Sequence, residues 1–143
     1  QAGFDTGIAL VNTSLDNART GNNQPFDTDT QTGACTVYYF DGTTSAPAPQ
    51  TTPPIPAGGM FAFTLAGGGV PGSTSSAAGF QGYAIVRCNF QFAHGFAFIS
   101  DRNTPSLGSQ GYLALVIPDR ADGLRLPQPF SVNGANSGEQ LGM

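Results

Sequence analysis

The chain has 143 residues and a net charge of -4, and only 10% of its residues are charged, against about 25% in an average globular domain. It contains no lysine and its five arginines are dispersed, whereas a protein that neutralises nucleic-acid phosphates needs clustered basic side chains, so nucleic acid is excluded as a partner. The 20 glycines and 11 prolines predict short strands joined by many turns.

Six segments have the composition or the two-residue alternation of β-strands, and turn-forming residues bound each of them. In chain order they are residues 6–12, 34–40, 60–65, 82–92, 96–100 and 112–117. His94 and Gly95 predict a tight turn between the fourth and fifth segments. No segment has helical periodicity. The sequence therefore predicts an all-β protein: one immunoglobulin-like antiparallel sandwich of about six to eight strands in residues 1–118, with extended terminal arms.

The two cysteines lie in different predicted strands, each on an apolar face. Cys88 alternates in step with Val86 and Phe90, and Cys35 opens the strand-like run that ends at Phe40. Their placement predicts a disulfide bond that links the two sheets. The chain begins at Gln1 without an initiator methionine, so we expect a mature protein exported through a cleaved signal peptide to the outside of the cell or to its surface. No apolar run reaches the length of a membrane-spanning helix.

Two segments outside the strands carry alternative interpretations. The proline-rich residues 43–56 predict a stiff exposed connection or an edge strand, with O-glycosylation or use as a polyproline ligand as the alternatives. Asn12, Thr13 and Ser14 fit an N-glycosylation acceptor, a short motif that also occurs by chance. The sequence alone does not decide whether Asn12 carries a glycan.

Several segments carry a resemblance to known proteins. They are TGIALVN at 6–12, YYFDG at 38–42, IPAGG at 55–59, GFQGY at 79–83, CNFQFAHGFAFIS at 88–100 and GYLAL at 111–115. The first four resemble a β-sandwich module of secreted proteins from environmental bacteria, and the last two are similar to segments of uncharacterised exported bacterial proteins. The resemblance implies an immunoglobulin-like sandwich outside a bacterial cell. It implies no activity and no catalytic residue.

The sequence offers no convincing catalytic group. His94 is the single histidine, and Ser100 and Asp101 are the nearest serine and carboxylate, but no nucleophile-elbow motif surrounds them. The carboxylates are not paired in strands as glycosidase chemistry requires, and the glycine run at 67–69 lacks the lysine of a phosphate-binding loop. We therefore expect no enzyme activity and no cofactor.

One segment has weak metal-binding character. Asp27 and Asp29 alternate with threonines, as oxygen ligands do in a calcium-binding loop. The match is incomplete, because Gly33 lies one position too late and the bidentate glutamate is missing. The sequence predicts no metal site, with these two aspartates as a weak calcium candidate.

The strand-like segments lack the charges that normally protect sheet edges. Arg87 is the only charged residue in 36–40, 60–65, 83–93, 96–99 and 112–117. The sequence therefore predicts a structural subunit that binds copies of itself, forming a filament by arm or strand exchange between sandwiches. The expected arm is 119–143, where apolar residues alternate, helped by the N-terminal strand. The residues expected in this contact are Leu124, Leu126, Phe130, Val132, Phe4 and Ile8.

Two alternatives to this hypothesis remain. The arm could fold back on its own sandwich instead of binding a neighbour. In function, the alternative is a secreted polysaccharide-binding or adhesion module with surface glycans as partners. The chain has four tyrosines that could stack on sugars but no tryptophan, so packing is the default role of these rings.

Overall fold

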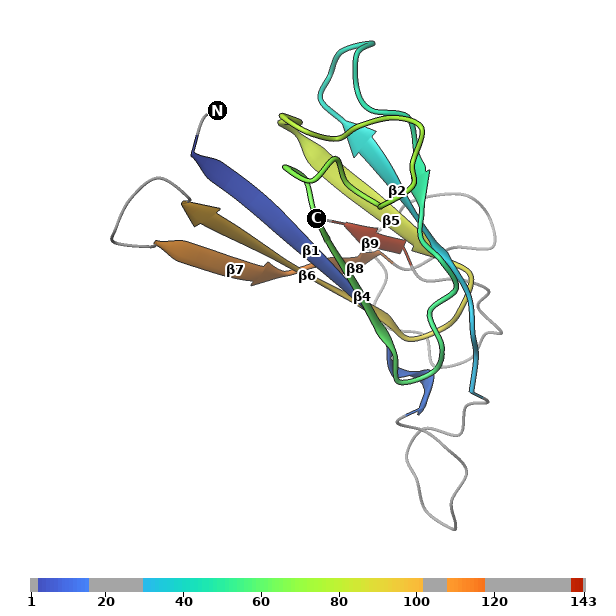
Figure 1. Ribbon diagram of the computed structural model, residues 1–143. Helices are drawn as coiled ribbons and strands as arrows, with labels where there is room; N and C mark the ends of the chain where they lie inside the picture. The colour runs from blue at the N-terminus through green and yellow to red at the C-terminus, as the bar shows by residue number, and fades with distance from the viewer. Residues whose placement is uncertain (1–2, 16–29, 102–107, 118–139, 143) are drawn as a thin grey trace.

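The computed structural model describes residues 3–15, 30–101, 108–117 and 140–142, and it confirms the predicted antiparallel β-sandwich (Figure 1). The strands are β1 (Phe4–Asn12), β2 (Cys35–Phe40), β3 (Gln50–Thr51), β4 (Met60–Thr64), β5 (Tyr83–Cys88), β6 (Ala93–Asp101), β7 (Ser109–Leu113), β8 (Leu115–Ile117) and β9 (Gln140–Gly142). In the described part of the chain, the one helical turn is the 3-10 helix η1 (Thr13–Leu15).

The strands form two sheets, which we call the first and the second sheet. The first has the order β4-β1-β6-β7 and the second the order β3-β2-β5-β9-β8, with antiparallel pairing throughout. β7 and β8 follow each other directly and are the edge strands of different sheets, so the chain passes from one sheet to the other at Ala114. The Ala114 amide donates to the Gly95 carbonyl oxygen (2.9 Å) at this crossing.

The core lies between the sheets, where alternate residues of facing strands meet. Its side chains are 6% exposed or less, and most come from β1, β2, β5 and β6. They are Ile8, Leu10, Cys35, Val37, Tyr39, Ile55, Phe63, Val70, Ala77, Ala84, Val86, Cys88, Phe90, Ala93 and Ala97. Two-residue alternation explains the strand residues of this set, because it turns every second side chain of a strand inward. The others, Ile55, Val70, Ala77 and Phe90, come from the connections between strands.

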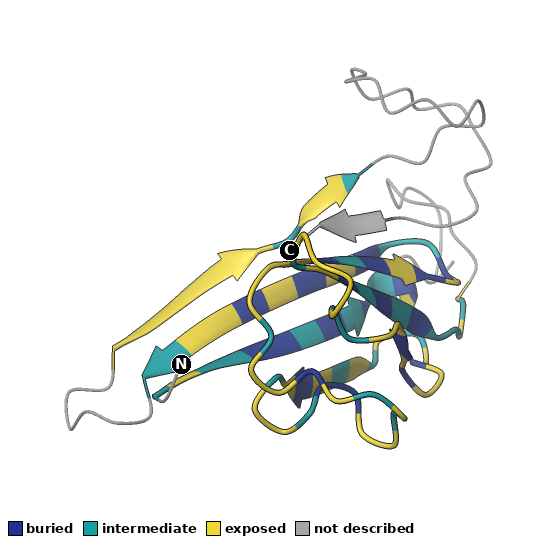
Figure 2. Cartoon of the chain, turned by 90° about the horizontal axis from the view of Figure 1, so that it is seen from above, coloured by how far each residue is buried: buried dark blue, intermediate teal, exposed yellow. Residues whose placement is uncertain are grey.

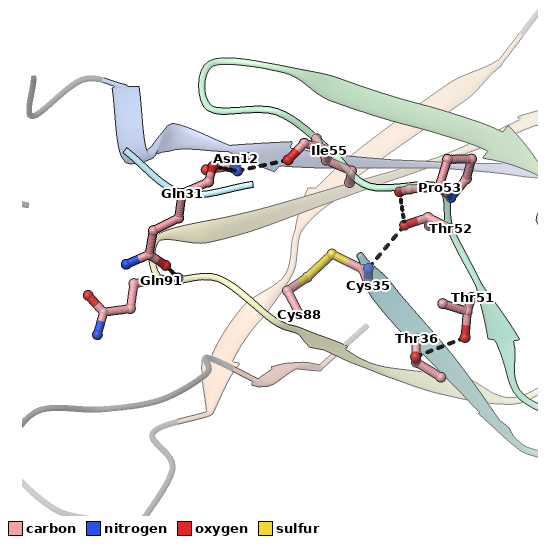
Figure 3. The surroundings of a disulfide bond; sticks show 10 residues. All are labelled: Asn12, Gln31, Cys35, Thr36, Thr51, Thr52, Pro53, Ile55, Cys88 and Gln91. Atoms are coloured by element: carbon pink, nitrogen blue, oxygen red, sulfur yellow. Dashed lines mark hydrogen bonds between the residues drawn. A yellow bond between two sulfur atoms is a disulfide. The ribbon is translucent and has the colours of Figure 1, made fainter. Parts of the chain in front are cut away.

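The disulfide between Cys35 and Cys88 is confirmed, but the prediction that it links the two sheets is wrong. The cysteines lie directly opposite each other on β2 and β5, neighbouring strands of the second sheet (Figure 3). Asn89 donates its amide to Ala34 (2.9 Å), which makes the adjacent cysteine pair one that exchanges no backbone hydrogen bonds. Such pairs have close side chains, and the Cα atoms of the cysteines are 4.0 Å apart. The antibody type of immunoglobulin domain instead joins its two sheets by a disulfide.

The predicted turn at His94 and Gly95 is also wrong. β5 ends at Cys88 instead of continuing to Phe92, and the chain turns within 89–92. Phe92 has a φ of 60°, and its carbonyl oxygen accepts hydrogen bonds from the amide (3.1 Å) and hydroxyl (2.8 Å) of Thr13. These contacts hold the turn at residues 89–92, before the predicted position. His94 therefore lies inside β6, where its register partner is Val11.

Part of the predicted C-terminal arm lies on its own chain. β9 pairs with β5 on one side and with β8 on the other, so this segment of 119–143 is a strand of the second sheet. β8 has no other strand partner among the described residues. Its attachment to the sheet therefore depends on β9.

Within the described ranges, no helix is long and apolar enough to cross a membrane.

Candidate functional site

The first sheet has two edge strands, β4 and β7, and β7 is the most exposed strand among the described residues. We call the side of β7 that faces away from β6 the open edge of this sheet. All five residues of β7 are exposed, and β8 continues this surface with Leu115 at 78% exposure and Val116 at 45% (Figure 2). Leu113 is 77% exposed. Ser109 to Ile117 contains no charged residue and no proline. Natural edge strands usually carry such residues because they prevent pairing with another chain.

The backbone of β7 has hydrogen-bonding groups directed away from the sheet. Gly108 and Ala114 bond to β6 through their backbones. Because antiparallel partners exchange hydrogen bonds at every second residue, Gln110 and Tyr112 also point toward β6. The amides and carbonyls of Ser109, Gly111 and Leu113 therefore point outward from the edge. No other described strand pairs with this side of β7.

The outer face of the first sheet, meaning the side turned away from the core, is apolar. Phe96 and Phe98 lie on it with stacked rings, 6.3 Å between centroids, and each is 39% exposed. The Phe98 ring covers Gly7 of β1 and the Phe96 ring covers Gly111 of β7, so closely that a methyl group at either glycine would overlap the ring. Aromatic rings that cover cross-strand glycines lie flat against the sheet.

The sequence showed these phenylalanines only as strand residues. Phe96 and Phe98 belong to an apolar run in which core and surface positions look alike. Their pairing with Gly7 and Gly111 depends on the register of β6 with β1 and β7, which no local pattern specifies.

The proline-rich segment 43–56 contains the short edge strand β3, as one of the two leading interpretations predicted. β3 pairs with β2 at the end of the second sheet, and Thr51 is exposed there. Gln50 is 1% exposed and holds the segment to the body of the protein. Its side-chain amide donates to the carbonyls of Gly68 (3.0 Å) and Ser75 (2.6 Å). This edge is therefore anchored by a buried side chain.

Gln50 also binds the hydroxyl of Tyr39 on β2. Tyr39 Oη donates to Gln50 Oε1 (2.7 Å), and the amide of Val70 donates to the same oxygen (2.8 Å). Burial raises the pKa of Tyr39 from 10.0 to about 12, because a phenolate would lose its hydration there. These contacts give the buried polar atoms partners and assign the cluster a structural role.

The possible glycosylation site is a second buried polar cluster. Asn12 is 0% exposed, and its Nδ2 donates to the carbonyls of Gln31 (2.8 Å) and Ile55 (3.0 Å) (Figure 3). Its Oδ1 accepts from the amide (3.1 Å) and hydroxyl (2.7 Å) of Ser14. In the folded chain the nitrogen that a glycan would need is buried and bonded.

The geometry separates the residues considered for catalysis. His94 is the second residue of β6, whereas Ser100 and Asp101 are the last two, so roughly 20 Å of strand lies between them. These three residues cannot form a triad. Asp41 accepts hydrogen bonds from the hydroxyl and the amide of Thr43 (both 2.7 Å), and these bonds lower the pKa of its carboxyl. Asp41 thus serves as a turn-forming residue.

The remaining predicted site residues have different outcomes. Asp27 and Asp29 lie outside the described residues, and the described ones contain no cluster of three potential metal ligands. The arm residues Leu124, Leu126, Phe130 and Val132 also lie outside the described part. Phe4 is 56% exposed at the start of β1, whereas Ile8 is 3% exposed and belongs to the core of its own chain. Ile8 therefore cannot offer its side chain to a neighbouring subunit.

A separate aromatic pair lies on the outer side of the second sheet. The rings of Phe40 and Tyr83 are stacked 5.0 Å apart with an interplanar angle of 13°, and Tyr83 is 57% exposed. The two residues are register partners on β2 and β5.

Comparison of the chain with protein-family models, curated proteins and solved structures finds no match.

Proposed function

We propose that the protein is a structural subunit that binds copies of itself outside the cell through the open edge of the first sheet. The observation that carries the proposal is the exposed, uncharged strand β7, whose outward backbone groups have no partner strand in the described part of the chain. An edge of this kind is a template for strand addition. The disulfide supports an oxidising compartment, as expected for an exported protein.

The edge is compatible with pairing to itself. In an antiparallel pair of β7 strands from two copies, Gly111 would face Gly111 of the other copy, and Ser109 would face Leu113. All three residues direct their backbone groups outward, so each would take part in the intermolecular ladder. Such a contact has two-fold symmetry, because both copies use the same surface.

The first test removes an outward hydrogen-bond donor while leaving the internal ladder intact. Ser109→Pro suits this purpose, because its amide points away from β6 and proline is tolerated at the first residue of an edge strand. Leu113→Lys is the second variant, since a lysine protects an edge by its charge. The matched control is Tyr83→Lys, an exposed aromatic on the other sheet.

Sedimentation velocity of the full chain gives the readout. We expect wild type and Tyr83→Lys to sediment as assemblies and both β7 variants to shift to smaller species. A wild type that stays monomeric at high concentration would contradict self-association. If the wild type assembles and both β7 variants assemble equally, the edge is not the contact.

The alternative function is a glycan-binding or adhesion module, which the exposed Phe40 and Tyr83 rings favour. Parallel aromatic surfaces are suited to stacking on the apolar face of a sugar ring. Tyr83→Ala should then abolish retention on an insoluble polysaccharide, whereas Leu113→Ala should not. Retention that is equal for both variants, or absent for the wild type, would contradict this alternative.

A further inference from the structure

We infer that the outer face of the first sheet is a second self-association surface, which binds the same face of another copy with the strands antiparallel. The inference rests on the proposed function and deepens it, because it names a second contact that joins paired copies into larger assemblies. A two-fold contact through β7 alone closes after two copies. Assembly beyond a dimer needs a second contact on another surface of the subunit.

Most outward side chains of this face are apolar or small. Its outward side chains come from alternate residues of β1, β4, β6 and β7, as the register of these strands shows. They are Asp5, Gly7, Ala9, Val11, Met60, Ala62, Thr64, His94, Phe96, Phe98, Ser100, Ser109, Gly111 and Leu113. Met60 is 66% exposed and the two phenylalanines 39% each. Contiguous exposed apolar surface of this kind marks interaction sites.

The shape of the face favours another flat sheet as its partner. Phe96 and Phe98 lie over Gly111 and Gly7 instead of projecting into solvent. The neighbouring outward residues Ala9 and Ala62 are small. Two sheets that meet face to face pack about 10 Å apart with interdigitated side chains, and a flat face of rings and alanines allows such an approach.

The arrangement of the polar residues on the face suits a second copy as the partner. Its ionisable outward residues are Asp5 and His94, and they lie toward opposite ends, because Asp5 is paired with Ser100 and His94 with Val11. Asp5 Oδ1 accepts the Ala66 amide (2.9 Å), which fixes its carboxylate at that end. A two-fold axis perpendicular to the strands brings the Asp5 end of each copy over the His94 end of the other. The same symmetry places Phe96 over Phe98.

The experiment introduces a charge on the face, in the full-length disulfide-bonded protein. Ala62→Arg is the main variant, because Ala62 is exposed on the edge strand β4 and its replacement need not disturb the core. Met60→Glu is a second variant at 66% exposure. Thr51→Arg is the matched control, an exposed residue on the edge strand of the other sheet.

Mass measurement separates the two contacts. We expect Ala62→Arg and Met60→Glu to stop at about twice the chain mass of 14.7 kDa, held by the β7 edge. Ser109→Pro should also stop at a dimer, held by the face, and Ser109→Pro combined with Ala62→Arg should be monomeric. Thr51→Arg should match the wild type.

The failures of the two proposals are distinguishable. A monomeric wild type overturns the proposed function together with this inference. If the wild type forms large assemblies and both Ala62→Arg and Met60→Glu form assemblies of the same size, the face contact is wrong and the edge contact stands.

Discussion

Cys35 and Cys88 lie opposite each other on the neighbouring strands β2 and β5, and Thr52 binds the backbone of Cys35 on the side away from β5. The Cys35 amide donates to Thr52 Oγ1 (3.0 Å; Figure 3). The Thr52 amide in turn donates to the Cys35 carbonyl (2.9 Å). The disulfide therefore joins strands that are already paired by hydrogen bonds. The backbone of Cys35 also holds Thr52, which follows β3. One covalent bond secures the second sheet at this point.

Replacing both cysteines by alanine should lower the free energy of unfolding by about 4 kcal/mol, because the bond closes a loop with a sequence separation of 53. Chemical denaturation of the oxidised wild type and the double variant measures the difference. Intact-mass analysis after alkylation without reductant is the control. Two alkylated thiols in the wild type would contradict the disulfide itself.

Gln50 should be among the polar residues that matter most for stability. Gln50→Leu keeps the volume but leaves the Tyr39 hydroxyl, the Val70 amide and two carbonyls without their partner, which should cost about 3 kcal/mol. Thr51→Ala, at the next position but exposed, should stay within about 0.5 kcal/mol of the wild type. Denaturation midpoints of the two variants decide the point. Equal effects would show that the Gln50 cluster contributes little.

Tyr39 makes stability depend on pH in the alkaline range. Its pKa is about 12 in the folded chain against 10.0 ordinarily, so the unfolded chain loses the proton first. Its contribution is fully present below pH 10 and is lost as the pH rises toward 12. Tyr39→Phe should be about 1 kcal/mol less stable at neutral pH, and this difference should shrink between pH 10 and 12. A difference that stays constant over this range would contradict the account.

Removing residues 140–143 should expose one side of β5 while leaving its other side protected. Asn89 bonds to Ala34, so alternation directs the amides of Ile85 and Arg87 toward β2 and the amide of Val86 toward β9. Hydrogen exchange at Val86 should therefore accelerate in the truncated chain, while Ile85 and Arg87 remain slow. Equal exchange at Val86 in both chains would show that β9 does not protect β5.

The sequence was sufficient for the sandwich because alternation and turn residues are local signals. Val37, Tyr39, Val86 and Cys88 all alternate visibly, so two strands and the pairing of Cys35 with Cys88 were predicted. The end of β5 and the placement of both cysteines in one sheet were not. β3 and β9 have two and three residues, too few to show a period. β9 was therefore not recognised, and β3 was expected only as one of the alternatives for the proline-rich segment. Their positions depend on tertiary partners such as β2 and β5.

The site was predictable in kind but not in place. The scarcity of charge in the strand-like segments indicated an unprotected edge but did not say which strand forms it. The structure places one of these segments, 112–117, in the edge strands β7 and β8. Which residues share a face depends on register, and the turn before β6 was predicted in the wrong position. Two long-range hydrogen bonds determine the position of that turn: Thr13 donates to the Phe92 carbonyl, and the Gln91 amide donates to the Gln31 side chain. No local sequence pattern contains these contacts.

Self-association of the unreduced full-length chain is the central claim, and sedimentation velocity over a range of concentrations tests it most directly. We predict species well above the chain mass of 14.7 kDa for the wild type, dimers for Ser109→Pro and for Ala62→Arg, and monomers for the two changes combined. A wild type that sediments as a single 14.7 kDa species at every concentration would contradict the account.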